Sequence, residues 1–302
     1  SSGRSSLPTI QHFFDDATSR LTYAVPAERQ AVVIDPLRGY ETRSAHTSWA
    51  GAEGVARYLD ARHLEVPYVI DTHAHADHMS GLPFFVERYG ARTVTGSRVG
   101  EVQSSFREIY GLDADFPTDG RQFDVLLEEG EKLEVGSFQV EALHTPGHTP
   151  AHMSWKIGDL VFLGDTLFMP DYGTARCDFP GGSAKELYAS IQRLYRLPDA
   201  TRLFVCHDYR PGGRPLAFET TVGDQKRHNV QCHARTTEEE FVRFREARDA
   251  KLDVPALLLP SLQVNIRAGA LPEPEPHGIR YLKLPLDLDC EGVRQEFRPR
   301  TS

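Results

Sequence analysis

Three histidines and an aspartate lie close together in the sequence, directly after an apolar run. Residues 66–71 form that run, and residues 72–78 read Thr-His-Ala-His-Ala-Asp-His. Imidazole and carboxylate groups are ligands of first-row metals. His73 and His75 are two positions apart, which lets both side chains face one point where a loop leaves a strand, whereas a helix would point them apart. The segment therefore predicts metal ligands at a strand end, with His73, His75, Asp77 and His78 as candidates.

Residues of ligand type also follow three other apolar segments. His148 ends a turn after residues 137–143, Asp165 follows residues 160–164, and His207 follows residues 202–206. A single His or Asp at a strand end is most often a turn former or a solvated group. Strand ends of like polarity, however, lie along one edge of an α/β sheet, where ligands usually bind. Together these segments indicate metal binding, with His144 and His152 expected as structural groups or neighbours of the ligands.

Hydrophobic patterning predicts a mixed α/β chain in which helices cover sheets. Short apolar, β-branched runs predict strands, and apolar residues at helical spacing predict helices. The expected strands are residues 21–25, 31–35, 66–71, 131–135, 137–143, 152–157, 160–163 and 202–206, and the expected helices are 51–64, 81–89, 184–197 and 237–250. No linker divides the chain, and the segment after Tyr209 is the one candidate for an appended region.

Composition narrows the classes of partner and of compartment. With 34 basic and 43 acidic residues the formal charge is −9, which argues against nucleic acid and anionic membranes. No apolar run approaches the ~20 residues of a membrane span, and no signal-peptide pattern is visible. Cys177, Cys206, Cys232 and Cys290 lie far apart, unlike a disulfide framework or a zinc knuckle. We therefore expect a cytoplasmic protein; a homodimer is compatible with the sequence but not required by it.

The residues alone leave the number of metals open. One arrangement gives one ion to His73, His75 and His148 and a second ion to Asp77, His78 and His207, with Asp165 as a bridge. Another uses two histidines and a carboxylate for a single iron, leaving one face open for substrate and oxygen. Imidazole and carboxylate suit zinc and ferrous iron alike, so ligand type does not decide between them.

These motifs resemble those of the metallo-β-lactamase superfamily. The matching segments are residues 73–78, 145–149 (Thr-Pro-Gly-His-Thr), 164–168 (Gly-Asp-Thr-Leu-Phe) and 206–209 (Cys-His-Asp-Tyr), in the order of its metal motifs. The resemblance implies a four-layer αββα sandwich with the metal centre at one edge of the paired sheets. It also implies a catalytic domain over residues 7–250 and a C-terminal extension, residues 251–302, packed on the same domain.

Within the superfamily the chain is most similar to the persulfide dioxygenases. Ala74 stands where glyoxalase II usually has a histidine, residues 173–179 (Gly-Thr-Ala-Arg-Cys-Asp-Phe) resemble a segment of the dioxygenases, and residues 207–209 match their His-Asp-Tyr. This resemblance implies one Fe(2+) per chain, held by His73, His148 and Asp165. The remaining candidates, His75, Asp77, His78 and His207, would then orient the ligands and bound water, and Arg176 and Tyr209 would line the thiol-substrate pocket.

The reaction implied is oxidation of a low-molecular-weight persulfide, first of all glutathione persulfide, by oxygen and water to thiol and sulfite, as in hydrogen sulfide detoxification. Two departures concern the thiol carrier. The segment from Asp165 to Arg176 is about two residues longer than in human-type members, which changes the pocket rim. Gln231 stands where those members carry a glutathione-binding arginine, and Lys226, Arg227 and Arg210 are candidates to replace it. The tail from Lys251 resembles bacterial β-lactamase-like hydrolases.

Two other functions compete with this reading. A dizinc hydrolase of the glyoxalase II type would use all seven candidate ligands to activate a hydroxide against a thioester or lactone. Zinc could also substitute for iron in the dioxygenase site. A non-catalytic sulfur- or metal-responsive binding protein on the same scaffold ranks below both, because such a protein has no need for every ligand position. A nuclease would need a basic surface that this composition does not provide.

Overall fold

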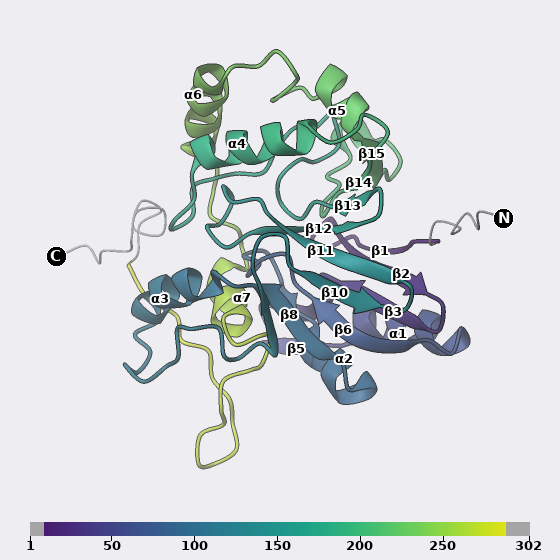
Figure 1. The fold of residues 1–302 in the computed structure, drawn as a ribbon. Coiled ribbons are helices and arrows are strands. Elements are labelled where there is room, and N and C mark those ends of the chain that lie inside the picture. Colours follow the sequence, from purple (N-terminus) through teal and green to yellow (C-terminus); the bar gives the residue numbers. More distant parts are fainter. Residues whose placement is uncertain (1–8, 288–302) are drawn as a thin grey trace.

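Two six-stranded β-sheets lie face to face in the computed structural model, which describes residues 9–287 (Figure 1). Helices cover the outer face of each sheet, so the expected four-layer αββα sandwich is confirmed. The first residues of the predicted 7–250 domain, residues 288–302 and Cys290 lie outside the described residues. The division of the chain at residue 250 stays a prediction.

The first sheet has the order β1-β2-β3-β6-β8-β9, antiparallel from β1 to β3 and parallel from β3 to β9. Its strands are β1 (Gln11–Asp15), β2 (Arg20–Ala27), β3 (Gln30–Ile34), β6 (Glu65–Ile70), β8 (Arg92–Gly96) and β9 (Val125–Leu127). A small sheet of order β5-β4-β7 lies beside it, formed by β4 (Leu37–Glu41), β5 (His46–Ser48) and β7 (Met79–Ser80).

The second sheet has the order β10-β11-β12-β13-β14-β15, in which only β13 and β14 pair in parallel. Its strands are β10 (Lys132–Val135), β11 (Phe138–His144), β12 (Met153–Ile157), β13 (Leu160–Phe162), β14 (Arg202–Phe204) and β15 (Glu219–Thr221). The helices are α1 (Ala50–Ala61), α2 (Leu82–Tyr89), α3 (Val99–Ile109), α4 (Ala184–Tyr195), α5 (Val222–His228), α6 (Glu238–Asp249) and α7 (Leu258–Asn265), with a 3₁₀ turn at Pro211–Gly213.

The main hydrophobic core lies between the two sheets. Tyr23 of the first sheet packs on Phe162 and Phe204 of the second, and fully buried Trp155 belongs to the same cluster. A second cluster joins α1 and α2 to the outer face of the first sheet, while α4 packs into the main cluster from the outer side of the second. Burial of apolar surface on both faces of each sheet holds the layers together and fixes where the strand ends lie.

Every strand and helix predicted from the sequence overlaps an element of the structure. Gly90, the residue that follows α2, adopts the left-handed conformation that glycine favours at helix ends. The Pro-rich segment 271–277 contains no helix or strand. Helix α3 was not predicted, because Gly100 and two serines weaken its helical propensity. The spacing of its buried Val102, Phe106 and Ile109 was the available signal.

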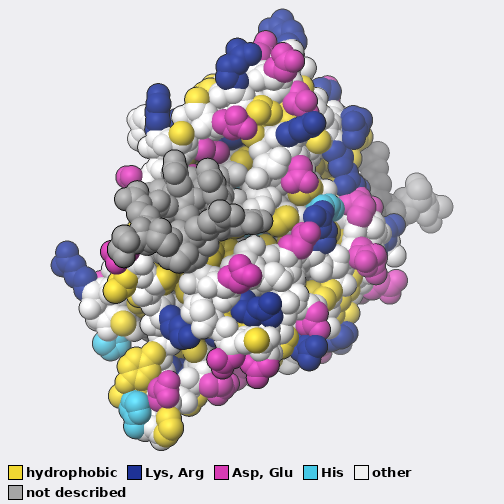
Figure 2. All heavy atoms as spheres, turned by 90° about the vertical axis from the view of Figure 1, so that its left-hand side faces the viewer, with side chains coloured by type: hydrophobic (Ala, Val, Ile, Leu, Met, Phe, Trp, Pro, Cys, Tyr) yellow, Lys and Arg dark blue, Asp and Glu magenta, His cyan; other side chains and the backbone are white. Residues whose placement is uncertain are grey.

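The surface carries charges of both signs. Lys and Arg side chains are intermingled with Asp and Glu on the face drawn in Figure 2, and no extended basic stripe is visible among the described residues of that face. Within residues 9–287 no helix is both long enough and apolar enough to cross a lipid bilayer.

Helix α7 packs against β7 and fixes the histidine-rich loop that lies between β6 and β7. Asn265, at its C-terminal end, is buried; its Nδ2 donates to the backbone oxygens of His75 and His78, each at 2.8 Å, and its Oδ1 accepts from the backbone nitrogen of Ser80 at 2.7 Å. Backbone groups in a buried loop need such partners. The segment after residue 250 therefore takes part in shaping the candidate metal loop.

Replacing Asn265 with alanine should loosen this loop. Asn265→Ala leaves three buried backbone groups without partners, so we expect a loss of about 2–4 kcal/mol in the free energy of unfolding. Metal affinity, measured by competition with a chelator, should fall by about tenfold because the loop carries ligands.

Gln263→Ala is the matched control on the same helix. Gln263 is equally buried, but its amide bonds the backbone of Lys283 rather than the histidine loop. It should lose stability and keep its metal affinity. Equal metal binding by the two variants would contradict the role assigned to Asn265.

Candidate metal centre

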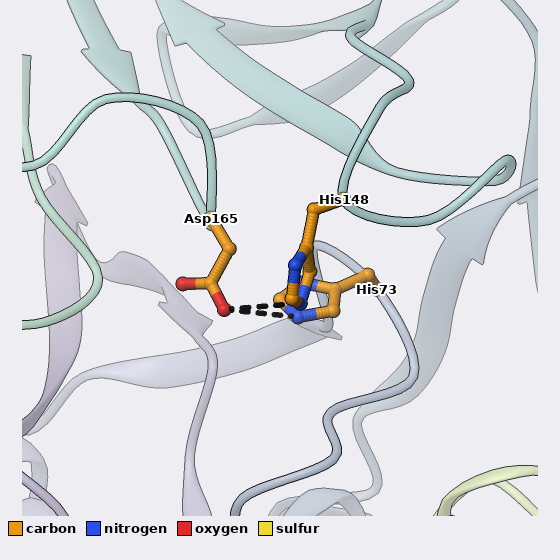
Figure 3. A group of neighbouring side chains, drawn as sticks. All are labelled: His73, His148 and Asp165. Carbon is orange, nitrogen blue, oxygen red and sulfur yellow. Dashed lines mark ion pairs between the residues drawn. The ribbon is translucent and has the colours of Figure 1, made fainter. Parts of the chain in front are cut away.

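The loops that follow β6, β11, β13 and β14 meet at one edge of the paired sheets. They bring together His73, His148, Asp165 and His207, which the sequence separates widely. One atom each of His73, His148 and Asp165 lies within 4.8 Å of the other two, and Figure 3 shows both rings pointing at the carboxylate. The predicted gathering of ligand candidates at a sheet edge therefore agrees with the positions of these side chains.

A single carboxylate oxygen faces both rings. His148 Nε2 lies 3.3 Å and His73 Nε2 3.5 Å from Asp165 Oδ2. Both distances exceed an ordinary hydrogen bond between such groups. The two nitrogens and the oxygen thus border a small space, which is the arrangement expected of three ligands around one ion.

The ring tautomers leave both Nε2 atoms with free lone pairs. The hydroxyl of Thr72 donates to Asp35 Oδ2 at 2.9 Å, so it must accept from His73 Nδ1, also at 2.9 Å. His148 Nδ1 donates to the backbone oxygen of Arg176 at 2.7 Å, because a carbonyl can only accept. Partners of this kind commonly orient metal-binding histidines.

A metal ion fits the site. His73 Nε2 is buried and has no hydrogen-bond partner within the described chain, a costly state for a polar atom unless something else occupies its lone pair. Two imidazole nitrogens and one carboxylate oxygen form the donor set that binds ferrous iron in many oxygenases and also suits zinc. The cluster is the metal-binding group of His and Asp typical of this fold; the donor set does not choose the metal.

His207 does not offer a free nitrogen. Its Nδ1 lies 2.9 Å from Asp165 Oδ1 and its Nε2 contacts Asp77 Oδ2. Ionised carboxylates only accept, so both nitrogens carry hydrogen. Burial opposes the charge, but Tyr209, Asp165 and Asp77 raise the pKa of His207 well above its ordinary value. In this arrangement His207 holds the Asp165 carboxylate in place.

The remaining histidines of the loop differ from each other. Arg20 Nη1 lies 2.8 Å from His75 Nδ1 and 3.4 Å from Nε2 of the same ring, and that Nε2 lies 3.0 Å from Asp35 Oδ1. His78 donates from Nδ1 to the backbone oxygen of Met79, and its buried Nε2 has no hydrogen-bond partner within residues 9–287. Asp77 Oδ1 lies 3.8 Å from His78 Nε2. Among the histidine candidates beyond the triad, His78 is therefore the one with a buried ring nitrogen that has no hydrogen-bond partner in this range.

Burial dominates the electrostatics of the ligand candidates. It lowers the pKa of His148 to about 4, so the ring is neutral and able to bind a metal near pH 7. Burial alone would raise the pKa of Asp165, but His207, with further help from His73 and His148, holds it well below the ordinary value. The site thus presents a neutral His148 imidazole and an ionised Asp165 carboxylate, which are the forms that coordinate metals.

His152 positions Asp165 without touching the triad's inner space. Its Nε2 accepts from the backbone nitrogen of Asp165 at 2.9 Å, so its Nδ1 donates to the Thr145 hydroxyl. That hydroxyl is bonded in turn to Ser154, which donates to the backbone oxygen of Leu163. The sequence placed His152 beside the ligands but gave no sign of this chain of hydrogen bonds. The preceding Gly164 has φ +60°, and a Cβ there would meet His152 Nε2 at 2.4 Å.

A cavity of about 370 Å³ opens at the triad. His148 and Asp165 reach it together with the expected substrate residues Arg176 and Tyr209. Tyr209 stacks on the His207 ring, with 5.4 Å between centroids and 5° between planes. Phe168 and Phe179 add apolar surface, and the cavity is of a size that holds a small substrate.

Gln231, which stands at the position of the family's glutathione-binding arginine, does not reach the cavity. Its Oε1 accepts from the backbone nitrogen of Thr174 at 2.8 Å and from Arg245 Nη1 at 3.1 Å. It therefore supports the cavity wall, and it is not among the residues that line the cavity. Lys226, Arg227 and Arg210, the candidates to replace the family's arginine, are also absent from the residues that line this cavity.

The positioning role of His152 can be tested by removing the ring. His152→Ala deprives the Asp165 backbone of its acceptor, so we expect a 10- to 100-fold lower metal affinity, roughly the effect of losing a group that supports a ligand. His144→Ala is the control, because within residues 9–287 the side-chain contacts of that ring are to the backbone oxygen of Pro150 and the Arg98 side chain, away from the candidate ligands. Isothermal titration of the metal-free proteins would measure both. Unchanged affinity in a folded His152→Ala protein would refute the role.

Comparison with known proteins extends this picture. The chain is 45% identical over 291 residues to a probable metallo-hydrolase of Burkholderia pseudomallei, covering 92% of this chain and 99% of that protein. It is 43% identical over 275 residues to Glyoxylase B2 of Dictyostelium discoideum, covering 90% and 94%. It is 48% identical to a beta-lactamase hydrolase-like protein of Agrobacterium fabrum, but spans only 65% of that protein's length and 93% of its own.

Two further matches carry the name of the dioxygenase group. Persulfide dioxygenase ETHE1 of Homo sapiens is 28% identical over 265 residues, covering 86% of this chain and 88% of the human protein. The crystal structure of ETHE1 from Myxococcus xanthus has a TM-score of 0.70 at 29% identity, covering 87% of this chain and all of that one. The sequence model of the metallo-beta-lactamase superfamily matches residues 16–207. The chain belongs to the metallo-beta-lactamase superfamily, and within it is similar to the persulfide dioxygenases.

Proposed function

We propose that the protein is a mononuclear Fe(II) persulfide dioxygenase that converts a low-molecular-weight persulfide, oxygen and water into thiol and sulfite. One observation carries the proposal. Among the described residues, His73, His148 and Asp165 bring two imidazole Nε2 atoms and one carboxylate oxygen together, and His148 and Asp165 line a cavity. Two histidines and one carboxylate on one side of an ion leave its other side open for reactants.

Ferrous iron, when bound, would supply open coordination positions and the electron transfer that side chains cannot provide. The chain's own residues would orient the substrate and limit water. Phe179 packs edge-on against the His148 ring at 5.1 Å, and Phe168 packs edge-on against Tyr209 at 5.7 Å. These rings add apolar surface to the cavity lining, which favours a sulfur atom over a hydrated group. Tyr209 lines the same cavity and is partly exposed to solvent.

The rim of the cavity offers a site for a negatively charged carrier. Arg176 is tied to Asp178 by two bonds of 2.7 and 2.8 Å, and Arg245 is tied to Asp249. Arg248, half-buried on α6, also lines the cavity, yet its guanidinium forms no ion pair or hydrogen bond within the described residues. A free guanidinium is the natural partner of a carboxylate. We assign carrier binding chiefly to Arg248, with Arg176 shaping the wall.

Glutathione persulfide is the first substrate to test, because its two carboxylates suit a free arginine in an otherwise acidic protein. Protein loaded with iron without oxygen should take up oxygen when this persulfide is added and release sulfite in a stoichiometric amount. His148→Ala should abolish both signals by removing a ligand. Iron-loaded wild type that takes up no oxygen with glutathione persulfide or with other small persulfides would overturn the proposal.

Arg248 gives a sharper test of the carrier. Arg248→Ala should raise the KM for glutathione persulfide by about 5–30-fold, the loss expected for one charge-assisted hydrogen bond, with little change in kcat. Arg243→Ala on the same helix is the control, because Arg243 is exposed and does not line the cavity. A similar KM for both variants would place carrier binding elsewhere.

A dizinc hydrolase is the alternative, and the relatives named metallo-hydrolase and Glyoxylase B2 support it. It requires a second metal bound through Asp77 and His78, with zinc lowering the pKa of its water. Asp77→Ala separates the two functions. It should leave the iron content of a dioxygenase nearly intact, but should strip one of two metals from a hydrolase. Thioester or lactone turnover by zinc-loaded protein, without oxygen uptake, would decide for the hydrolase.

A further inference from the structure

A hairpin-shaped arm projects from the body of the molecule after helix α7. Residues 271–287 leave the sandwich, turn and come back, at the lower end of Figure 1. Two backbone hydrogen bonds close the turn at the tip, from the Glu275 nitrogen to the Ile279 oxygen at 2.9 Å and from the Gly278 nitrogen to the Glu275 oxygen at 2.7 Å. The arm does not line the cavity at the metal centre, so the proposed reaction does not account for it.

The arm is held in a defined position at its base. The side-chain amide of Gln263, which is buried on α7, bonds the backbone nitrogen and the backbone oxygen of Lys283, each at 2.7 Å. Lys283 Nζ donates to the backbone oxygen of Gly111 at 2.9 Å, and Arg280 Nη1 donates to that of Pro272 at 2.6 Å. An element fixed in this way loses little conformational entropy when it binds a partner.

Large apolar side chains are concentrated on the returning half of the arm. Ile279, Tyr281, Leu284 and Leu286 are 53%, 54%, 65% and 73% exposed, and they make up four of the eight exposed large hydrophobic residues in the described part of the chain. Figure 2 shows hydrophobic side chains gathered at the lower end of the molecule. Single apolar side chains are normal on the surface of a monomer, but a group of them on a projecting element is typical of a protein–protein contact.

The charges of the arm are ordered along its length. Glu273 and Glu275 lie toward the tip, and their carboxylates form no ion pair or hydrogen bond within the described chain. Arg280 and Lys283 direct their cations toward the body, where their hydrogen bonds lie. Arg38 of β4 adds positive charge there: its buried Nε has no partner in the described chain, burial lowers its pKa, and the nearby Arg280 lowers it further. The tip thus carries uncompensated negative charge and the base uncompensated positive charge.

We propose that this arm binds a second copy of the chain, with the arms of the two copies packed antiparallel about a two-fold axis. In that arrangement the acidic tip of each arm meets the basic base of the other, and the apolar side chains of the two arms cover each other. The occupant is a second copy because one arm carries both halves of the charge pattern and so complements itself. The acidic tip and the formal charge of −9 disfavour an anionic membrane as the partner.

Sedimentation equilibrium of the full chain tests the proposal. Wild type should be a dimer at micromolar concentrations. Tyr281→Glu places a charge within the apolar contact and should weaken the dimer by about 100-fold or more. Val230→Glu is the matched control, because Val230 is an apolar side chain outside the arm that is 65% exposed, and it should leave the dimer intact. Both variants should keep the metal content of wild type, since neither residue lines the cavity at the centre.

Charge reversal tests the antiparallel arrangement. Glu275→Arg and Arg280→Glu should each weaken the dimer by about tenfold or more, because each places like charges opposite one another, and the double variant should regain most of the wild-type affinity. A double variant as weak as the single ones would refute this arrangement. A monomeric wild type, or a dimer that Tyr281→Glu leaves intact, would overturn the proposal. Leu286→Glu, at a still more exposed position, replaces Tyr281→Glu if that variant does not fold. None of these outcomes depends on the metal or on the proposed reaction.

Discussion

The carboxylate of Asp165 joins the two halves of the molecule at the candidate centre. One oxygen faces His73, from a loop of the first sheet, and His148, from a loop of the second. The other oxygen contacts His207, while the backbone nitrogen of the same residue is held by His152. Since an ionised carboxylate in a buried site requires compensating donors or cations, the loops from both sheets must converge at this point for the group to be stable there.

Neighbouring polar groups decide which atoms face the centre. Thr72 and the backbone of Arg176 each take the Nδ1 hydrogen of a ligand histidine, which leaves both Nε2 lone pairs directed inward. Burial keeps the His148 ring neutral, and His207 keeps Asp165 ionised. The protein therefore fixes the protonation states before any ion arrives, which is the preorganisation that a metal site of defined composition requires.

Local hydrophobic patterns in the sequence predicted much of the fold. Residues 66–71 and 160–163 are short apolar runs that became buried strands, and the residues 184–197 repeat Leu187, Ile191 and Leu194 on the buried face of α4. The sequence patterns did not predict helix α7, because its hydrophobic residues show little periodicity. The helix matters for the centre through one side chain, that of Asn265. That side chain donates a hydrogen bond to the backbone of a loop far away in sequence, so no local sequence pattern could predict this contact.

The same division applies to the centre. The sequence by itself determined which residue types follow the strand ends, and hence the candidates, because alternation of side chains and the polarity of parallel strands are local properties of the chain. Only the tertiary structure decided which candidates keep a free lone pair. Asp35, directly after β3, engages Nε2 of His75, while Asp77 and Asp165 engage both nitrogens of His207. Whether a histidine can bind a metal depends on what touches its ring nitrogens, and those contacts are made between segments that lie far apart in the chain.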